Sequence, residues 1–165
     1  MPRVERPAMS DYGVPADLDG ALPWEWATER LTANRNYWVV TIDPDLQPHS
    51  MPVWGVWSDD DSFWFSCSPN ALKARNIVLN PKVVVTTSDT VEVVSVEGTA
   101  AATPVPYDIA VAWAHKYGDG TQSVEEMVEF FSSNAAFHVT PHKAIGMIER
   151  AEDFARCATR WSWAS

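Results

Sequence analysis

Short runs of β-branched and aromatic residues recur along this chain, and most are separated by only a few turn-forming residues. Val, Ile, Thr, Tyr, Phe and Trp favour strands, whereas Pro, Asp and Asn favour turns. Strands with such short connections pair antiparallel, because a parallel crossover needs a dozen residues or more. The expected strands are residues 37–43, 48–57, 62–68, 83–87, 91–99, 136–148 and 154–163.

Helical features appear between some of these strands. Proline suits the first turn of a helix, as at Pro23, and ends a helix that precedes it, as at Pro81. The expected helices are residues 23–31, 70–80, 107–117 and 123–131. About seven strands with a few peripheral helices predict a mainly β (α+β) fold, a small antiparallel barrel.

The length of 165 residues suits one domain. Residues 1–20 carry Pro, Gly and Asp without a period, so we expect a flexible N-terminal segment before a single domain over residues 21–165. Twelve Lys and Arg against 22 Asp and Glu give a net charge of −10, which argues against nucleic acid or an anionic membrane as the partner.

The expected location is cytoplasmic. No apolar run is long enough to cross a bilayer, and the N-terminal residues lack the apolar stretch of a signal peptide. Cys67 and Cys157 form no CxxC pair, which fits reduced thiols in a reducing compartment.

Tryptophan is unusually frequent, with nine in the chain, and Trp54, Trp57 and Trp64 lie close together in sequence. These rings either build the core or stack on a flat ligand. Alternation along residues 62–68 places Phe and Cys on one face. The opposite face carries hydroxyl groups around one indole ring: Ser62, Trp64, Ser66 and Ser68. Such a face suits a flat heterocycle with polar edges.

The helix expected at residues 70–80 begins with cationic side chains. Ser68 or Asn70 is the expected N-cap, which places Lys73 and Arg75 in the first two turns. Cations there oppose the helix dipole, whereas a bound phosphate would compensate them. The alternative is that both side chains are solvated or paired with acidic residues.

No metal site or side-chain nucleophile is expected. His138 and His142 fall in a predicted strand, where residues four apart are separated by about 13 Å. The Asp run at residues 59–61 reads as a solvated hairpin tip, because no further ligands follow at loop spacing. No serine lies in an elbow motif with a histidine partner.

Three segments occur in an order typical of one family: Pro-His-Ser-Met-Pro-Val-Trp at residues 48–54, Ser-Pro-Asn-Ala-Leu-Lys-Ala-Arg-Asn at residues 68–76 with Asn-Pro-Lys-Val at residues 80–83, and Val-Glu-Gly-Thr-Ala at residues 96–100. In these motifs the chain resembles the pyridoxamine 5′-phosphate oxidase-like split β-barrel proteins, and among them the flavin/deazaflavin oxidoreductases common in actinobacteria. The resemblance spans roughly residues 24–163. It implies a split β-barrel homodimer with two cofactor sites at the dimer interface. Members bind FMN or coenzyme F-420, a 5-deazaflavin, and some bind FAD or haem.

The resemblance also implies a set of cofactor-binding residues. By position, Lys73 and Arg75 would hold the cofactor phosphate, and Ser68 and Asn76 would assist them. A strand would run beneath the tricyclic ring: His49, Ser50, Met51, Pro52, Val53 and Trp54.

Further ring contacts are expected from Trp64 and Ser66, on the same pocket wall. Near the C-terminus, Trp161 and Trp163 share a face that either packs in the core or covers the partner's cofactor pocket. Some relatives that use the deazaflavin carry arginine where this chain has Ala71, so the choice of cofactor stays open.

The leading expectation is therefore an F-420- or FMN-dependent oxidoreductase. It would pass a hydride from coenzyme F-420, favoured over FMN because of the Trp-rich strands, to a planar conjugated small molecule. The cofactor would do the bond-making, which fits the lack of catalytic side chains. One alternative is an FMN-dependent pyridoxamine phosphate oxidase-like enzyme, for whose substrate phosphate Arg160 is the sole C-terminal candidate. Another is a non-catalytic flavin or deazaflavin carrier.

Overall fold

A computed structural model describes residues 1–164 of the chain. The strands are β1 (Arg3–Glu5), β2 (Asn36–Ile42), β3 (Pro48–Ser58), β4 (Ser62–Cys67), β5 (Lys82–Thr87), β6 (Glu92–Ala102), β7 (Ala135–Ile148) and β8 (Thr159–Ser162). The helices are η1 (Ser10–Tyr12, 3₁₀), α1 (Trp24–Ala33), α2 (Leu72–Leu79), α3 (Tyr107–Tyr117), α4 (Val124–Ser133) and α5 (Phe154–Cys157).

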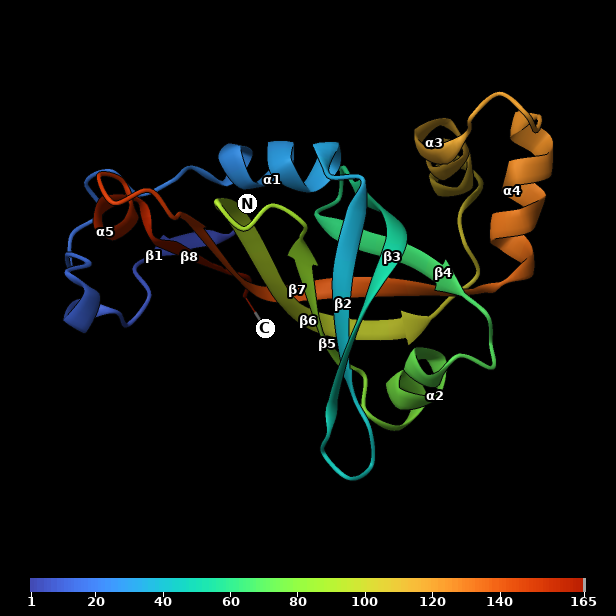
Figure 1. Ribbon diagram of the computed structural model, residues 1–165, viewed down its shortest axis with the longest axis horizontal. Coiled ribbons are helices and arrows are strands. Elements are labelled where there is room, and N and C mark those ends of the chain that lie inside the picture. The colour runs from blue at the N-terminus through green and yellow to red at the C-terminus, as the bar shows by residue number, and fades with distance from the viewer. Residues whose placement is uncertain (165) are drawn as a thin grey trace.

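Six strands close an antiparallel barrel in the order β7, β4, β3, β2, β5 and β6, and the β6–β7 pairing completes the ring (Figure 1). Strand β7 pairs with β6 along one edge. Its other edge pairs with β4 through residues 135–139 and with β8 through residues 143–146, so the sheet splits there. The predicted mainly β barrel with peripheral helices is confirmed.

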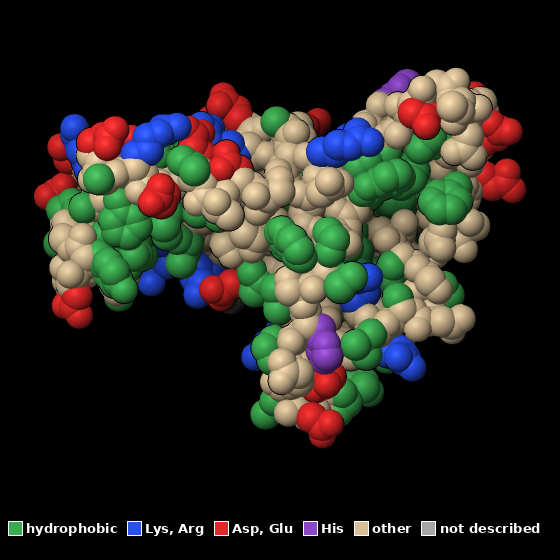
Figure 2. Space-filling view, viewed as in Figure 1, with side chains coloured by type: hydrophobic (Ala, Val, Ile, Leu, Met, Phe, Trp, Pro, Cys, Tyr) green, Lys and Arg blue, Asp and Glu red, His purple; other side chains and the backbone are tan. Residues whose placement is uncertain are grey.

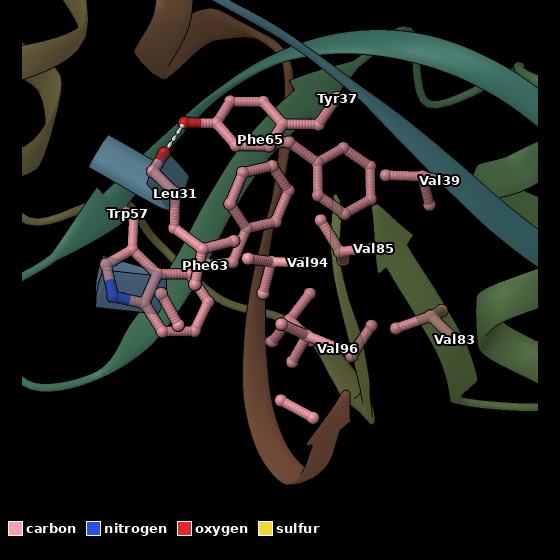
Figure 3. Packing of buried hydrophobic residues seen from close by; sticks show 14 of the residues in the cluster. Leu31, Tyr37, Val39, Trp57, Phe63, Phe65, Val83, Val85, Val94 and Val96 are labelled. Atoms are coloured by element: carbon pink, nitrogen blue, oxygen red, sulfur yellow. Dashed lines mark hydrogen bonds between the residues drawn. The ribbon is translucent and has the colours of Figure 1, made fainter. Parts of the chain in front are cut away.

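The barrel interior is filled by the alternate residues of its strands, as Figure 3 shows for Tyr37, Phe63, Phe65 and their valine neighbours. The Tyr37 hydroxyl donates a hydrogen bond to the Leu31 carbonyl and so ties β2 to α1. Gly55 lets the ring of Phe63 approach the backbone, since a Cβ there would lie 2.2 Å from Phe63 Cζ.

Helices α3 and α4 pack together beside the barrel (Figure 1), where α3 covers the outer face of β3 and α4 contacts β7. They form a second apolar cluster, in which Val56 of β3 meets Trp113 of α3 and Phe131 of α4. The Ser123 hydroxyl and the Glu126 carboxylate cap α4 reciprocally, which explains why this helix begins where it does.

Two local predictions at the ends of elements were wrong. Residues 154–163 form helix α5 followed by β8 rather than one strand, because Cys157 and Ala158 donate helical backbone hydrogen bonds to Asp153 and Phe154. The N-cap of α2 is Ala71, not Ser68 or Asn70. Ser68 instead closes the preceding turn, where its hydroxyl accepts from the Asn70 N–H.

Residues 1–20 lie against the C-terminal part of the chain, and their predicted flexibility stays a prediction. Strand β1 pairs with β8. Arg6 donates hydrogen bonds to the carbonyls of Asp17, Asp19, Arg156 and Ala158 at 2.6–2.8 Å. The sequence did not reveal β1, because three residues with one apolar side chain carry no periodicity. Among the helices of residues 1–164, none is long and apolar enough to span a membrane.

Candidate functional site

The predicted phosphate-binding lysine lines a hollow where α2 meets the ends of β2 and β3. We call it the Lys73 hollow; it has a volume of about 320 Å³. Its walls are Val39, Thr41, His49, Met51, Leu72 and Lys73. The structure thus brings together three residues that the sequence assigned to one site: His49, Met51 and Lys73.

The electrostatics of the Lys73 hollow favour an anion. Lys73 is the second residue of α2. The first backbone N–H groups of a helix have no acceptor within the helix, so they are free to bind an anion. Within residues 1–164, Lys73 forms no ion pair. A cation at this end of a helix opposes the dipole, so a bound anion would relieve the conflict.

His49 is held in place by an acidic neighbour. Its Nε2 lies 3.0 Å from Oδ2 of Asp43, at the turn that joins β2 to β3. This hydrogen bond, followed by one from the Gln47 backbone N–H, holds the pKa of Asp43 below its usual value. The charged carboxylate therefore fixes the imidazole at the rim of the hollow.

Asn76 does not line the Lys73 hollow but holds together two of the elements that form it. The side chain is 1% exposed, and its Nδ2 donates a hydrogen bond of 3.1 Å to Oγ1 of Thr41. Asn76 thus ties α2 to β2 and sets the position of Lys73 over the strand.

Arg75 lies elsewhere. Its side chain lines a groove, here called the Arg75 groove, with Pro69, Ala74, Val78, Leu79, Ala102, Ala135 and Phe137. Residues two apart in a helix point about 200° apart around its axis, so Lys73 and Arg75 face opposite sides of α2. The structure does not bring them together as one clamp within the chain.

A second hollow, the Trp54 hollow, lies between the barrel and the α3–α4 pair, with a volume of about 210 Å³. It is lined by Trp54, Ser66, Cys67, Ser68, Trp113, Phe130 and Asn134. One face of the Trp54 ring stacks on Tyr117, with centroids 4.6 Å apart and planes 8° apart.

Cys67 links the two hollows, because it lines the Trp54 hollow and lies within range of the charge of Lys73, which lines the other. Burial raises the pKa of the Cys67 thiol, and the nearby charge of Lys73 partly offsets that effect. The predicted residues Trp54, Ser66 and Ser68 are therefore grouped together, next to Lys73 but on a separate wall.

The remaining predicted site residues are dispersed. Ser50 and Pro52 are exposed on the outer face of β3, whereas Val53 is buried in the core. Trp64 is buried and stacks on His138 with centroids 4.5 Å apart, and it does not line the Trp54 hollow with Ser66. It lines a third hollow with Asp59, Asp60 and Asp108, among others.

Trp161 has no exposed surface, and its ring packs against Trp24 and Gly146. Of the two alternatives for this residue, core packing is the one found. Because the ring is enclosed in the core of this chain, it offers little surface to a ligand here, and the expected contact of Trp161 with a cofactor stays a prediction.

The helical side of the site was not predicted from the sequence. Trp113 and Tyr117 are four residues apart in α3, as are Phe130 and Asn134 around the end of α4. Their helical spacing was a usable signal that each pair shares a face. Which strand that face covers was not readable from the spacing.

The side chains that line these hollows supply groups for binding a ligand. In the part of the chain that the structure describes, no group of three His, Cys, Asp or Glu side chains is placed to hold a metal ion. A cation and helix N–H groups suit a phosphate, and the adjoining aromatic and hydroxyl walls suit a flat ring with polar edges.

A family model described as pyridoxamine 5′-phosphate oxidase matches residues 25–140. Comparison with curated protein sequences gives no match. Among solved structures, the conserved hypothetical protein Rv2991 from Mycobacterium tuberculosis has a TM-score of 0.68 and 22% identity, covering 81% of this chain and 89% of that one. An F420 reductase has a TM-score of 0.57 and 19% identity, covering 70% of this chain and 93% of that one. An FAD-binding protein from Mesorhizobium loti has a TM-score of 0.57 and 19% identity, covering 86% and 96%.

Proposed function

Because the chain belongs to the pyridoxamine 5′-phosphate oxidase family, we propose that it is an oxidoreductase that binds coenzyme F-420 or FMN and reduces a planar conjugated small molecule. The observation that carries the proposal is the Lys73 hollow. It combines an ion-pair-free lysine within the described residues, the N-terminus of α2 and apolar walls next to an aromatic hollow.

The residues of the Lys73 hollow fit a phosphorylated flat cofactor. Lys73 and the N–H groups at the start of α2 would hold the phosphate. Val39, Met51 and Leu72 would exclude water beside it, and His49 would offer a hydrogen-bonding group at the rim. When bound, the cofactor would supply the hydride chemistry. We favour F-420 because of the tryptophan-rich strands, and the F420 reductase among the structural neighbours fits that preference.

Two features argue against pyridoxamine phosphate oxidation itself. Arg160, the C-terminal candidate for the substrate phosphate, already donates a 3.0 Å hydrogen bond to Glu5 Oε2. The Trp54 hollow carries no charged side chain that would bind a second phosphate.

We also propose that the protein is a homodimer. Hydrophobic side chains lie exposed over β2 and β3 (Figure 2). Trp38 and Pro52 are register partners on the outer face of these strands, and both are exposed. A second copy is the proposed cover for this face, and sedimentation velocity at micromolar concentration should show a dimer. A lone 18.4 kDa species would contradict this.

The proposed function is tested by equilibrium binding of F-420 and of FMN, each followed by quenching of tryptophan fluorescence. Saturable binding of at least one is expected. The protein with reduced cofactor is then offered a panel of quinones, enones and tetrapyrroles, and oxidation of the cofactor by one of them is expected. Binding without any oxidation would favour a carrier, and no binding of either cofactor would overturn the proposal.

A further inference from the structure

We propose that the Trp54 hollow is the subsite for the acceptor, and that it selects a neutral, flat aromatic ketone or a conjugated carbonyl compound of similar shape. The inference rests on the proposed function, because it assigns the phosphate end of the cofactor to the neighbouring Lys73 hollow. It goes further by naming the wall that recognises the second reactant.

The aromatic part of the hollow comes from three elements. Trp54 of β3 is 45% exposed, although one face of its ring is stacked on Tyr117. Phe130 of α4 is 57% exposed at the rim, and its ring stacks on Trp113 at an angle of 27°, with centroids 6.1 Å apart. Large exposed rings beside a hollow leave their faces open to another ring, and stacking adds to the free energy of burial.

The polar part of the hollow is neutral. Ser66 and Ser68 supply hydroxyl groups, and none of the lining side chains is charged. Trp113 is 2% exposed, and in the described part of the chain its Nε1 has no hydrogen-bond partner. Hydroxyl donors without a cation in the lining favour a carbonyl oxygen over a carboxylate or phosphate.

The Lys73 hollow and the Trp54 hollow differ in the charge of their linings. Lys73 would take the anionic cofactor, whereas an acceptor with its own charge would meet no counter-charge among Trp54, Ser66 and Trp113. The two neighbouring hollows therefore divide by charge, and discrimination between cofactor and acceptor follows from that division.

The test uses 1-indanone, a flat bicyclic ketone, with two matched compounds. Octahydroindan-1-one keeps the ketone but lacks the aromatic ring, and indane keeps the ring but lacks the ketone. Binding to the full chain is followed by the indole N–H signals in proton–nitrogen NMR spectra. We expect 1-indanone to shift the signals of Trp54 and Trp113, and to bind about twofold to tenfold more tightly than octahydroindan-1-one.

Variants separate the walls of the hollow. Phe130→Ala should lower the affinity for 1-indanone about twofold to tenfold. The matched control Tyr107→Ala removes an exposed ring of α3 that lines none of these hollows, and should leave binding unchanged. Ser66→Ala should lower the affinity for 1-indanone but leave the affinity for indane unchanged, because indane has no carbonyl oxygen to accept a hydrogen bond.

The outcomes distinguish this inference from the proposed function. Lys73→Ala should weaken the binding of the cofactor and leave the affinity for 1-indanone unchanged. The inference is overturned if 1-indanone leaves the Trp54 and Trp113 signals unshifted, or if saturating FMN or F-420 displaces it from them, because the hollow would then hold the cofactor ring. If neither cofactor binds while 1-indanone shifts both signals, the ketone site stands and the proposed function fails.

Discussion

Lys73 and Arg75 are two residues apart in α2, yet their side chains line hollows on opposite sides of the helix. Lys73 faces His49 and Met51 across the Lys73 hollow. Arg75 lies over Ala102 and Phe137 in the Arg75 groove. The two cations therefore line different hollows, and substituting one should leave the other hollow unchanged.

Lys73→Ala should weaken the binding of F-420 or FMN about 10- to 150-fold, the range expected when a hydrogen bond to a charged group is lost. Arg75→Ala is the matched control and should change the affinity less than about twofold, because its side chain lines another groove. Titration at two salt concentrations checks the cause, since a phosphate contact weakens with salt whereas ring stacking barely responds. Equal losses in both variants would show that Arg75 reaches the same phosphate.

Asn76→Ala should lower the free energy of unfolding by about 1–3 kcal/mol, because it removes a buried hydrogen bond to Thr41. Urea unfolding measures this loss. Asn70→Ala, at an exposed position just before α2, is the control and should stay within about 0.5 kcal/mol. Because α2 carries Lys73, cofactor affinity should fall as well. Unchanged stability would show that α2 is held without this contact.

Because of Lys116, the free energy of unfolding should rise between pH 8 and pH 10. Its Nζ donates to the Tyr37 hydroxyl at 2.7 Å and to the Gly55 carbonyl at 3.0 Å, and burial lowers its pKa from 10.5 to about 8. Between these values the unfolded chain holds a proton that the folded chain has released, so raising the pH favours the folded state. Below pH 8 both states are protonated, and the cost of burying the charge is fully present.

The measurement compares urea unfolding of the parent protein and Lys116→Met at several pH values. The parent should gain stability from pH 8 to 10 relative to the variant, by well under the limiting slope of about 1.4 kcal/mol per pH unit, since the side chain is only partly buried. Burial raises the pKa of Tyr37, which opposes the gain above pH 10. Parallel curves for the two proteins would contradict the prediction.

Arg6→Ala should expose the N-terminal segment to proteolysis, because the Arg6 guanidinium joins residues 17–19 to the turn before β8. Cleavage by chymotrypsin at Tyr12 should be about tenfold faster, since opening of the segment becomes easier. Arg3→Ala is the control, because the Arg3 side chain is 80% exposed and, within residues 1–164, its one ion pair is with Glu5 at 3.4 Å. Equal cleavage in all three proteins would support a segment that is already flexible.

Trp161→Ala should destabilise the fold by about 3–5 kcal/mol, because it empties a wholly buried site beside Gly146. Trp163→Ala, at a partly buried position, should cost less. Thermal unfolding of both variants checks the order. A loss of cofactor affinity in Trp161→Ala at unchanged stability would restore the view that this ring covers a ligand.

Local patterns in the sequence were enough to predict the strands of the barrel and most helices. Successive side chains of a strand point to opposite faces, so alternation was enough to place Phe63 and Phe65 together on the core face. That the opposite face, with Ser62 and Trp64, is also buried was not readable from alternation. Prolines marked where α1 begins and where α2 ends. Lys73 was found because a cation at a helix N-terminus is a local conflict that the sequence alone exposes.

Tertiary structure decided how the site is divided. Trp54 and Trp113 are 59 residues apart, and they line one hollow because α3 packs on the outer face of β3. Strand β1 carries too few residues for a periodic pattern, and its pairing with β8 depends on where residues 1–20 meet the C-terminal part of the chain. Local patterns record which face of an element is buried, but which faces meet is set by packing between distant segments, and no short window of sequence contains that information.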